Sequence, residues 1–182
     1  MVVRGATYER RPLDFYQTPG ETTRVLFNFA RFGERVVDPC CGDGAILKTL
    51  KEQGYKKATG DDLIQGYDFL LHPWRWAGAD IVTNPPFGPG GRTAVKFIER
   101  ALEVTTLHQG KVALLLPVDF DSGKTRTHVF RDCPQFSLKI VLLNRIRWFN
   151  GISGASNHCW SLWDHRHKGP PVIAYAVQDF ES

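Results

Sequence analysis

The residues best suited to chemistry begin directly after a short apolar run, where the chain reads Asn84, Pro85, Pro86 and Phe87. Proline lacks an amide hydrogen, fixes its own φ angle and keeps the preceding residue out of the helical region. We therefore expect a rigid strand end that presents the Asn84 side-chain oxygen and the Pro85 carbonyl as two acceptors. Two acceptors can hold both hydrogens of a planar amine, while the Phe87 ring stacks on the flat group that carries the amine.

A second set of candidate residues lies in a turn at residues 38–44, between a short apolar strand and a helix. Gly42 and Gly44 allow the backbone to pass close to a ligand and to adopt torsion angles that other residues avoid. Asp38 and Asp43 would repel a pyrophosphate, but they suit a ligand that carries an amine or a sulfonium cation. The turn also lacks the third glycine of the dinucleotide fingerprint, which argues against a nicotinamide-dependent oxidoreductase.

Acidic residues follow the next predicted strand. Asp61 and Asp62 lie about twenty residues beyond the glycines, where a carboxylate can accept both hydrogen bonds of a ribose diol. The residues alone leave open which of the two takes this role. Farther along, Asp68 can accept from an adenine amino group, and Phe69 supplies a flat apolar neighbour for the ring. Each feature alone also fits an ordinary turn or a solvated acid, so their order along the chain carries the argument.

These candidate residues need a scaffold in which strand ends meet, and the hydrophobic pattern predicts one. A strand, a turn and a helix are expected over residues 34–54, with helices over 20–33 and 92–110 and a weaker one over 123–134. Strands are expected at residues 56–63, 78–87, 111–117, 138–149, 157–165 and 172–177. Because strands alternate with helices, we predict an α/β fold with a mainly parallel, doubly wound sheet covered on both faces. The closing run of successive strands predicts an antiparallel edge strand.

Size and composition favour one globular domain over residues 1–182, with 42 % hydrophobic and 23 % charged residues. The net charge of +4 and the pI of about 8.9 permit a nucleic acid partner without requiring one. The four cysteines have neither the spacing of a zinc site nor that of a secreted disulfide framework, so we expect no metal and a reduced, cytoplasmic setting. The sequence has neither a signal peptide pattern nor an apolar run of membrane-spanning length.

The ordered motifs resemble those of the Rossmann-like S-adenosylmethionine-dependent methyltransferases. In that family the glycine turn receives the methionine part of the cofactor, the acid after the second strand binds ribose, and the acid of an Asp-Phe pair binds adenine. Residues 14–19 also resemble a segment that closes over the cofactor carboxylate. The resemblance implies S-adenosylmethionine as cofactor, bound by Tyr16, Thr18, Pro19, Asp38, Cys40, Gly42, Gly44, Asp62, Asp68, Phe69 and Asn84.

Asn-Pro-Pro-Phe is the catalytic tetrapeptide of the N6-adenine DNA methyltransferases, and the chain resembles small phage or prophage members of this family. The resemblance implies methyl transfer to adenine N6 in DNA by direct in-line displacement. A related tetrapeptide that ends in tyrosine is shared with enzymes that methylate RNA bases or protein glutamine amides. These two substrates, and a non-catalytic module that binds cofactor or nucleic acid, stay open as alternatives.

Residues 145–165 resemble a hairpin that lies over the target base in several such enzymes. The resemblance places Phe87, Arg145, His158 and Trp160 at the substrate, with Phe149 and Asn157 as further candidates. Trp160 fits a core position equally well, and so does Trp163. His158 also fits a structural, hydrogen-bonded histidine.

Target recognition has no dedicated segment in this sequence, so we expect no separate recognition domain. Recognition is expected from the loops at 88–93, 119–127 and 150–157, or from a protein partner or a homodimer. Basic residues near these loops can line a phosphate path, although each also fits a solvated surface charge. They are Arg92, Lys124, Arg126, Arg131, Arg145 and Arg147.

Overall fold

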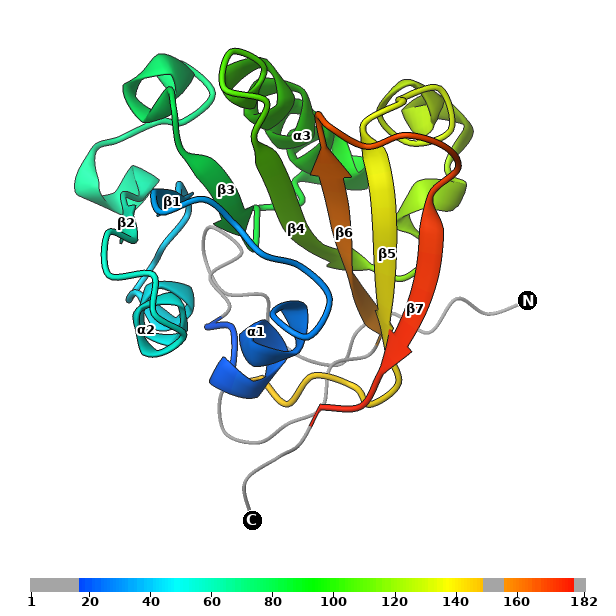
Figure 1. The fold of residues 1–182 in the computed structure, drawn as a ribbon, viewed down its shortest axis with the longest axis horizontal. Coiled ribbons are helices and arrows are strands. Elements are labelled where there is room, and N and C mark those ends of the chain that lie inside the picture. The colour runs from blue at the N-terminus through cyan, green and yellow to red at the C-terminus, as the bar shows by residue number, and fades with distance from the viewer. Residues whose placement is uncertain (1–16, 149–155, 179–182) are drawn as a thin grey trace.

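A computed structural model describes residues 17–148 and 156–178 of the chain. Tyr16, Phe149 and most of the loop at 150–157 lie outside the described residues. The described strands form one seven-stranded sheet in the order β2-β1-β3-β4-β6-β5-β7 (Figure 1). Their bounds are β1 Val36–Asp38, β2 Thr59–Gly60, β3 Asp80–Thr83, β4 Lys111–Pro117, β5 Phe136–Leu142, β6 His158–Asp164 and β7 Val172–Ala176.

Helices and short 3-10 turns connect these strands. The α-helices are α1 Gly20–Leu26, α2 Ala45–Glu52 and α3 Arg92–Thr105. The 3-10 helices are η2 Leu63–Gln65, η3 Pro73–Trp76, η4 Pro89–Gly91, η5 Phe120–Ser122 and η6 Lys124–Val129. Among the residues described, no helix is both long enough and apolar enough to cross a membrane.

Most neighbouring strands run parallel. β1 pairs parallel with β2 and β3, and β3 pairs parallel with β4. Within the described sheet, β6 alone runs the other way, between β4 and β5, and β7 then pairs parallel with β5 at the margin. The predicted Rossmann-like α/β fold with a mainly parallel sheet is confirmed. Its antiparallel strand lies inside the sheet and not at the outermost position, because β5 and β7 pair beyond it.

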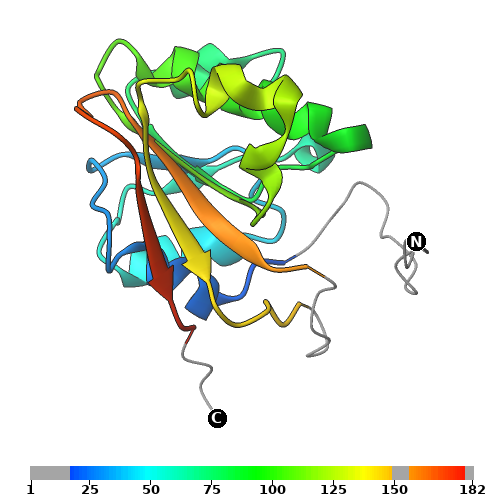
Figure 2. The same cartoon turned by 90° about the vertical axis from the view of Figure 1, so that its right-hand side faces the viewer.

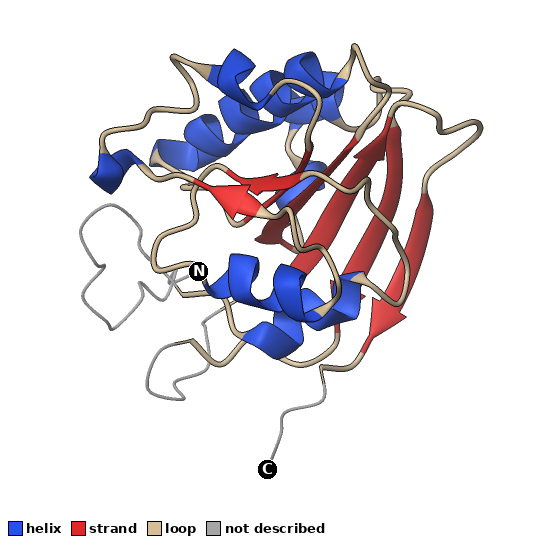
Figure 3. Ribbon diagram, turned by 60° about the vertical axis from the view of Figure 1, so that its left-hand side comes forward, coloured by secondary structure: helices blue, strands red, loops and turns tan. Residues whose placement is uncertain are grey.

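Helices cover both faces of the sheet, which gives three layers (Figure 3). On one face, Leu26 of α1 and Leu50 of α2 pack against a cluster that includes Leu115 of β4. On the other face, Ile98 of α3 packs in a second cluster with Leu114 of the same strand. Neighbouring residues of β4 thus face opposite layers, as the alternation of side chains along a strand requires.

Several elements differ from the sequence predictions. The helix expected over 20–33 ends at Leu26, and the chain then turns so that Phe27 packs against Tyr55 with ring centroids 5.4 Å apart. The helix expected over 123–134 is the 3-10 helix η6. The strand expected over 138–149 begins at Phe136 and ends at Leu142. Tertiary packing of aromatic residues and loop contacts sets these ends, and the local pattern does not encode them.

One edge of the sheet gathers the strand ends that carry the candidate residues. Because β1, β2 and β3 are parallel, Asp38, Gly60 and Thr83 all end at this edge. β6 runs in the opposite direction, so its first residue, His158, pairs with Pro117 at the end of β4. This is the edge at which open α/β sheets bind their ligands.

Candidate active site

The turn after β1 is built by glycines in the left-handed region. Gly42 has a φ of 52° and Gly44 a φ of 87°, conformations that side-chain-bearing residues rarely adopt. The Gly44 amide donates to the Cys41 carbonyl oxygen at 2.7 Å, and α2 begins at the next residue. Gly42 lines the main cavity of the site, whereas Gly44 shapes the turn behind it.

Asp38, the last residue of β1, lies buried beneath this turn with 1 % of its surface exposed. Its Oδ1 accepts a hydrogen bond from the Thr83 hydroxyl at 2.7 Å and another from the Cys40 amide at 3.1 Å. Burial nevertheless raises the pKa of Asp38 to about 7, and the charge of Asp62 acts in the same direction. A cationic group in the cavity would favour the ionised carboxylate and would in turn be attracted by it.

Asp61 and Asp62 follow β2 but face different surroundings. Asp62 lines the cavity, where its Oδ2 accepts from the Gly42 amide at 2.9 Å and its Oδ1 accepts from the Ile64 amide at 3.0 Å. Asp61 forms an ion pair with Arg75, with 3.1 Å between Oδ2 and Nη2, and borders a separate surface hollow. Of the two acids proposed for ribose, the structure brings Asp62 to the cavity.

Apolar side chains form the part of the cavity that follows β2. Phe69 is buried, and its ring stacks on that of Phe97 from α3 with centroids 5.3 Å apart. Leu63 and Ile64 line the cavity while more than half of each residue stays exposed. Asp68 lies in the same wall, and its Oδ1 accepts from the Leu70 amide at 2.8 Å. This combination suits a flat ring that carries a hydrogen-bond donor.

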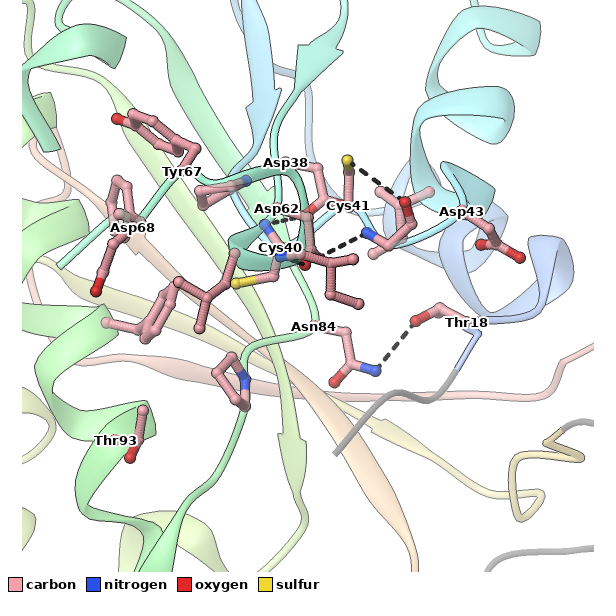
Figure 4. A pocket seen from close by; sticks show the side chains of 18 of the residues that line it. Thr18, Asp38, Cys40, Cys41, Asp43, Asp62, Tyr67, Asp68, Asn84 and Thr93 are labelled. Carbon is pink, nitrogen blue, oxygen red and sulfur yellow. Dashed lines mark hydrogen bonds between the residues drawn. The ribbon is translucent and has the colours of Figure 1, made fainter. Parts of the chain in front are cut away.

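Asn84 follows directly after β3 and also lines the cavity. Its side-chain Nδ2 donates to the Thr18 hydroxyl oxygen at 3.2 Å. Because the amide nitrogen faces Thr18, the amide oxygen points away from that residue (Figure 4). Thr18 and its neighbour Gln17 complete the cavity wall ahead of α1. The segment before α1 therefore contributes to the orientation of the Asn84 amide.

The remaining residues of the tetrapeptide divide between the cavity and the core. Pro86 lines the cavity, and Pro85 is buried. Phe87 packs partly against the hydrophobic cluster under α3 and does not line the cavity. Its carbonyl oxygen accepts from the amides of Thr93 at 3.2 Å and Ala94 at 3.4 Å, at the start of α3. These bonds fix the tetrapeptide to the helix that follows it.

Cys40 and Pro19 support the site in different ways. Cys40 lines the cavity, and burial raises the pKa of its thiol well above the usual range. Pro19 is the N-cap residue of α1, and its carbonyl oxygen accepts from the Thr22 amide at 3.1 Å. Pro19 does not line the cavity and lies between Thr18, which does, and the start of α1.

The residues described above as lining a cavity all surround the same one, which has a volume of about 400 Å³. Its walls come from the ends of β1, β2 and β3, from the segment before α1 and from the first turns of α2 and α3. Figure 4 shows Asp43 at one end and Asp68 at the other, with Asp38 and Asp62 between them. The volume is in the range of small-molecule sites, about 300–1,000 Å³. Its carboxylates and apolar walls suit a ligand with a cation, a diol and a flat ring.

The residues that were expected to cover a target base lie in different surroundings, some buried and one exposed. Trp160 is fully buried in the cluster under α1, and its Nε1 donates to the Thr22 carbonyl oxygen at 2.8 Å. The prediction that Trp160 contacts a substrate is therefore wrong, because its side chain fills the core. His158 is also buried, and burial lowers its pKa to about 4. Arg145 is exposed, and its Nε donates to Asn157 Oδ1 at 3.4 Å.

The basic residues suggested for a phosphate path differ in their hydrogen bonds and in their exposure. Arg126 joins η5 and η4, because its guanidinium donates to the Phe120 and Gly90 carbonyl oxygens, each at 2.8 Å. Arg131 is held by the neighbouring Asp132 through bonds of 2.7 and 3.0 Å. Arg92, Lys124 and Arg147 are exposed.

Sequence reasoning missed several residues of the site. Thr83 donates to Asp38, and no feature of the sequence pattern marks it as more than a strand residue. Gly60 is required where β2 passes β1, because a Cβ there would lie 2.5 Å from the Asp38 carbonyl oxygen. The sequence could have indicated Leu63 and Ile64 as site residues, because they are apolar and come directly after a strand-end acid.

Comparisons with known proteins give a structural likeness and no sequence match. No protein-family model matches the chain, and no curated protein matches its sequence. A modification subunit of a putative type I restriction enzyme from Vibrio vulnificus YJ016 has a TM-score of 0.64 and 18 % identity, over 90 % of this chain and 47 % of that one. A putative class I S-adenosylmethionine-dependent methyltransferase from Listeria monocytogenes has a TM-score of 0.64 and 15 % identity, over 88 % and 65 %.

The M protein of the type I restriction enzyme EcoKI has a similar fold, with a TM-score of 0.57 and 15 % identity, over 81 % of this chain and 43 % of that one. The chain spans less than two thirds of the length of each of these three solved proteins. At such identities the likeness shows the fold. The chain has the Rossmann-like fold of the S-adenosylmethionine-dependent methyltransferases.

Proposed function

We propose that this chain is an S-adenosylmethionine-dependent methyltransferase that transfers a methyl group to the exocyclic N6 amine of adenine in DNA. The position of Asn84 carries the proposal. This residue is an amide acceptor at a strand end, and it lines the same cavity as Asp38 and Asp62. A group that can hold an amine therefore lies beside a cavity suited to a cationic nucleoside. The similar folds of two type I restriction subunits that modify DNA support a DNA substrate.

The cavity residues fit the parts of the cofactor. S-adenosylmethionine, when bound, supplies an activated methyl group on a sulfonium cation. We assign the ribose hydroxyls to Asp62, because its carboxylate faces the cavity beside the glycine turn. We assign the methionine end to Asp38 and the Gly42 backbone, and the adenine amine to Asp68. The exposed apolar rim of Leu63 and Ile64 then packs on the adenine ring.

The target amine is held by acceptors at the end of β3. The Asn84 amide oxygen and the Pro85 carbonyl each accept one amine hydrogen, which draws the nitrogen lone pair out of the ring. Phe87 is partly exposed and lies outside the cofactor cavity, so we assign it to stacking on the target base. A bound cofactor would supply its methyl group to the nitrogen that Asn84 and Pro85 hold, giving up its bond from carbon to sulfur, and the amine would lose a proton to solvent. Positioning and electrostatics supply the rate acceleration.

Selection of a target sequence requires surfaces beyond this cavity. The chain corresponds to 47 % of the Vibrio vulnificus subunit and 43 % of the EcoKI M protein. We propose that a partner protein or the surface loops supply recognition, with the exposed Arg145 among the phosphate contacts.

The test uses S-adenosylmethionine that carries a labelled methyl group. The protein is incubated with separate pools of double-stranded DNA, single-stranded DNA, RNA and protein extract, and the labelled product is identified after digestion. Label in N6-methyldeoxyadenosine is the expected result. Label in RNA or in glutamine would support the assigned cofactor and contradict the assigned substrate. Binding of cofactor without any transfer would indicate a non-catalytic module.

The catalytic assignment is tested with Asn84→Ala in the same assay. This variant should lose methyl transfer while calorimetry shows cofactor affinity close to that of the unmodified chain. Asn28→Ala is the matched control, because Asn28 is exposed and lies outside the cavity. Activity in Asn84→Ala equal to that of the control would exclude Asn84 as the group that holds the amine.

A further inference from the structure

The guanidinium of Arg126 joins two segments that are distant in the chain. Arg126 lies in η6, which packs beside α3 on one face of the sheet (Figure 2). Its Nη1 donates to the Phe120 carbonyl oxygen in η5, and its Nη2 donates to the Gly90 carbonyl oxygen in η4, each at 2.8 Å. The guanidinium carbon also lies 3.8 Å from the centroid of the Phe120 ring. We call this set of contacts the Arg126 joint.

The two joined segments begin at neighbouring strand ends. η4 follows β3 and the tetrapeptide, whereas η5 follows β4. β3 and β4 are parallel, and Thr83 at the end of β3 pairs with Leu114. β4 continues beyond this pair to Pro117. Both segments therefore extend past the same edge of the sheet, which is the edge that carries Asn84.

η4 is tied to the tetrapeptide on one side and to Arg126 on the other. The Phe87 carbonyl oxygen accepts from the Thr93 amide at 3.2 Å, and η4 lies between these two residues in the chain. The stretch from Phe87 to Thr93 is thus a short closed loop. Because Arg126 binds this loop at Gly90, a shift of η4 would be passed on to Phe87.

η5 is anchored in the core and provides the fixed side of the Arg126 joint. Phe120 is buried in the cluster under α3, where its ring meets the Phe130 ring edge to face with centroids 6.1 Å apart. The next residue, Asp121, forms an ion pair with Lys139 of β5 at 2.6 Å. η4 is therefore the segment that Arg126 holds against a fixed neighbour.

A glycine leaves the space that the guanidinium occupies. A Cβ on Gly91 would lie 2.7 Å from Arg126 Nη2 and 2.8 Å from Phe120 Cε2, closer than real Cβ atoms come. Gly90 has a similar left-handed backbone, with a φ of 62° against 76° for Gly91. A Cβ on Gly90, however, would have no described atom within 4 Å. The two glycines thus differ in contact with the Arg126 joint and not in backbone strain.

We propose that Arg126 is a positioning residue for the target base, because it holds η4 against η5 and thereby keeps Phe87 in place. This rests on the proposed function, which puts the target amine at Asn84 and Pro85 and the base against Phe87. Arg126 does not line the cofactor cavity, so its effect reaches the reaction through Phe87. Its donors engage carbonyl oxygens of the protein, in contrast to the phosphate contact that the sequence suggested.

The first measurement is the rate of single-turnover methyl transfer at saturating cofactor and DNA, taken per folded molecule. Arg126→Ala should lower this rate roughly tenfold to hundredfold, the scale expected when a reacting group is misplaced. Calorimetry should show cofactor affinity close to that of the unmodified chain, because Arg126 lies outside the cofactor cavity. A rate in Arg126→Ala equal to that of the unmodified chain would overturn the proposal.

The same variants separate positioning from phosphate contact. A phosphate contact adds to the salt dependence of DNA affinity, and lysine can supply it as a point charge. Positioning needs the fork of two donors, so Arg126→Lys should also be slow, and Arg126→Ala should keep the salt dependence of the unmodified chain. A shallower salt dependence in Arg126→Ala together with the full rate in Arg126→Lys would overturn the proposal and assign Arg126 to phosphate binding.

Gly91→Ala disturbs the Arg126 joint without removing a charge. Its methyl group should push the guanidinium away from Phe120 and lower the rate as Arg126→Ala does. Gly90→Ala is the matched control for backbone strain, because its methyl group meets no described atom of the joint, and its rate should fall clearly less. Equal rates in the two glycine variants would contradict the proposal, since the contact with Arg126 would then have no effect.

Hydrogen exchange tests the Arg126 joint independently of methyl transfer. In Arg126→Ala, the amides of Gly91 and Thr93 should exchange faster than in the unmodified chain, because the loop that they close is released. Unchanged exchange of these amides would overturn the proposal whatever the transfer assay shows. Faster exchange, in a protein whose unmodified chain methylates none of the substrate pools, would support the joint and contradict the proposed function instead.

Discussion

The side-chain nitrogen of Asn84 lies 3.2 Å from the hydroxyl oxygen of Thr18, and this hydrogen bond joins segments 66 residues apart in the chain. Thr18 is 2 % exposed, so its hydroxyl is largely shielded from water. The bond orients the Asn84 amide with its nitrogen toward Thr18. The segment before α1 therefore acts on the proposed target site as well as on the cofactor cavity.

Thr18→Val should lower the rate of methyl transfer, because it removes the hydroxyl that orients Asn84 while nearly preserving side-chain volume. Loss of one such bond is worth about 1–3 kcal/mol, or roughly a tenfold to hundredfold fall in rate. The measurement is single-turnover transfer at saturating cofactor, with cofactor affinity determined in parallel. Thr18→Ser keeps the hydroxyl and should retain most of the rate. Equal losses in both variants would assign the effect to packing of the methyl group.

Asp62→Ala should weaken cofactor binding, whereas Asp61→Ala should leave it nearly unchanged. Asp62 lines the cavity and also holds the Gly42 amide, while Asp61 pairs with Arg75 outside it. Loss of a charged hydrogen-bonding group costs about 1.5–3 kcal/mol, which corresponds to roughly a tenfold to hundredfold weaker affinity. Calorimetry with S-adenosylmethionine measures both variants. A larger effect from Asp61→Ala would reverse the assignment of the ribose site.

Trp160→Phe should destabilise the fold without changing the choice of substrate. The change removes the hydrogen bond from Nε1 to the Thr22 carbonyl and leaves part of a packed volume empty. The expected loss is about 1–3 kcal/mol in the free energy of unfolding, measured with urea. Transfer per folded molecule should remain close to that of the unmodified chain. A selective loss of affinity for nucleic acid at unchanged stability would show instead that Trp160 contacts the target.

The meeting of Asp38, Asp62 and Asn84 at one cavity could be predicted because parallel strands end at a common edge. Their spacing placed each residue at or just beyond the end of a strand, and the sheet topology then brought them together. The choice between Asp61 and Asp62 could not be made in this way, because it depends on Arg75, which comes from η3 farther along the chain.

The burial of aromatic residues near the end of the chain could not be predicted from the local sequence pattern either. Trp160 and His158 alternate with their neighbours as strand residues should, but alternation does not reveal which face of a sheet a helix covers. Trp160 faces α1, whose end at Leu26 is itself set by aromatic packing. The edge position of β7 likewise depends on β6 inserting between β4 and β5, an order that the sequence pattern does not encode.

Asp38 should make the stability of the protein depend on pH in a direction opposite to that of a salt-bridged acid. Burial raises the pKa of Asp38 from 3.8 to about 7 in the folded protein. Between these values the folded state holds a proton that the unfolded chain has lost. Stability conferred on the protein by this group therefore falls as pH rises from about 4 to about 7, and it levels off above that. The full effect is roughly 4 kcal/mol for a shift of this size.

Asp38→Asn should remove this slope, since the amide oxygen can still accept from Thr83 and Cys40 but the side chain no longer titrates. The measurement is the free energy of unfolding in urea at several pH values for both chains. His158 titrates in the same range with the opposite sign, because burial lowers its pKa to about 4, so its stabilising effect is lost as pH falls below 6.5. That contribution is common to both chains and cancels in their difference. A difference that stays constant from pH 4 to 7 would show that Asp38 is ionised in the folded protein throughout this range.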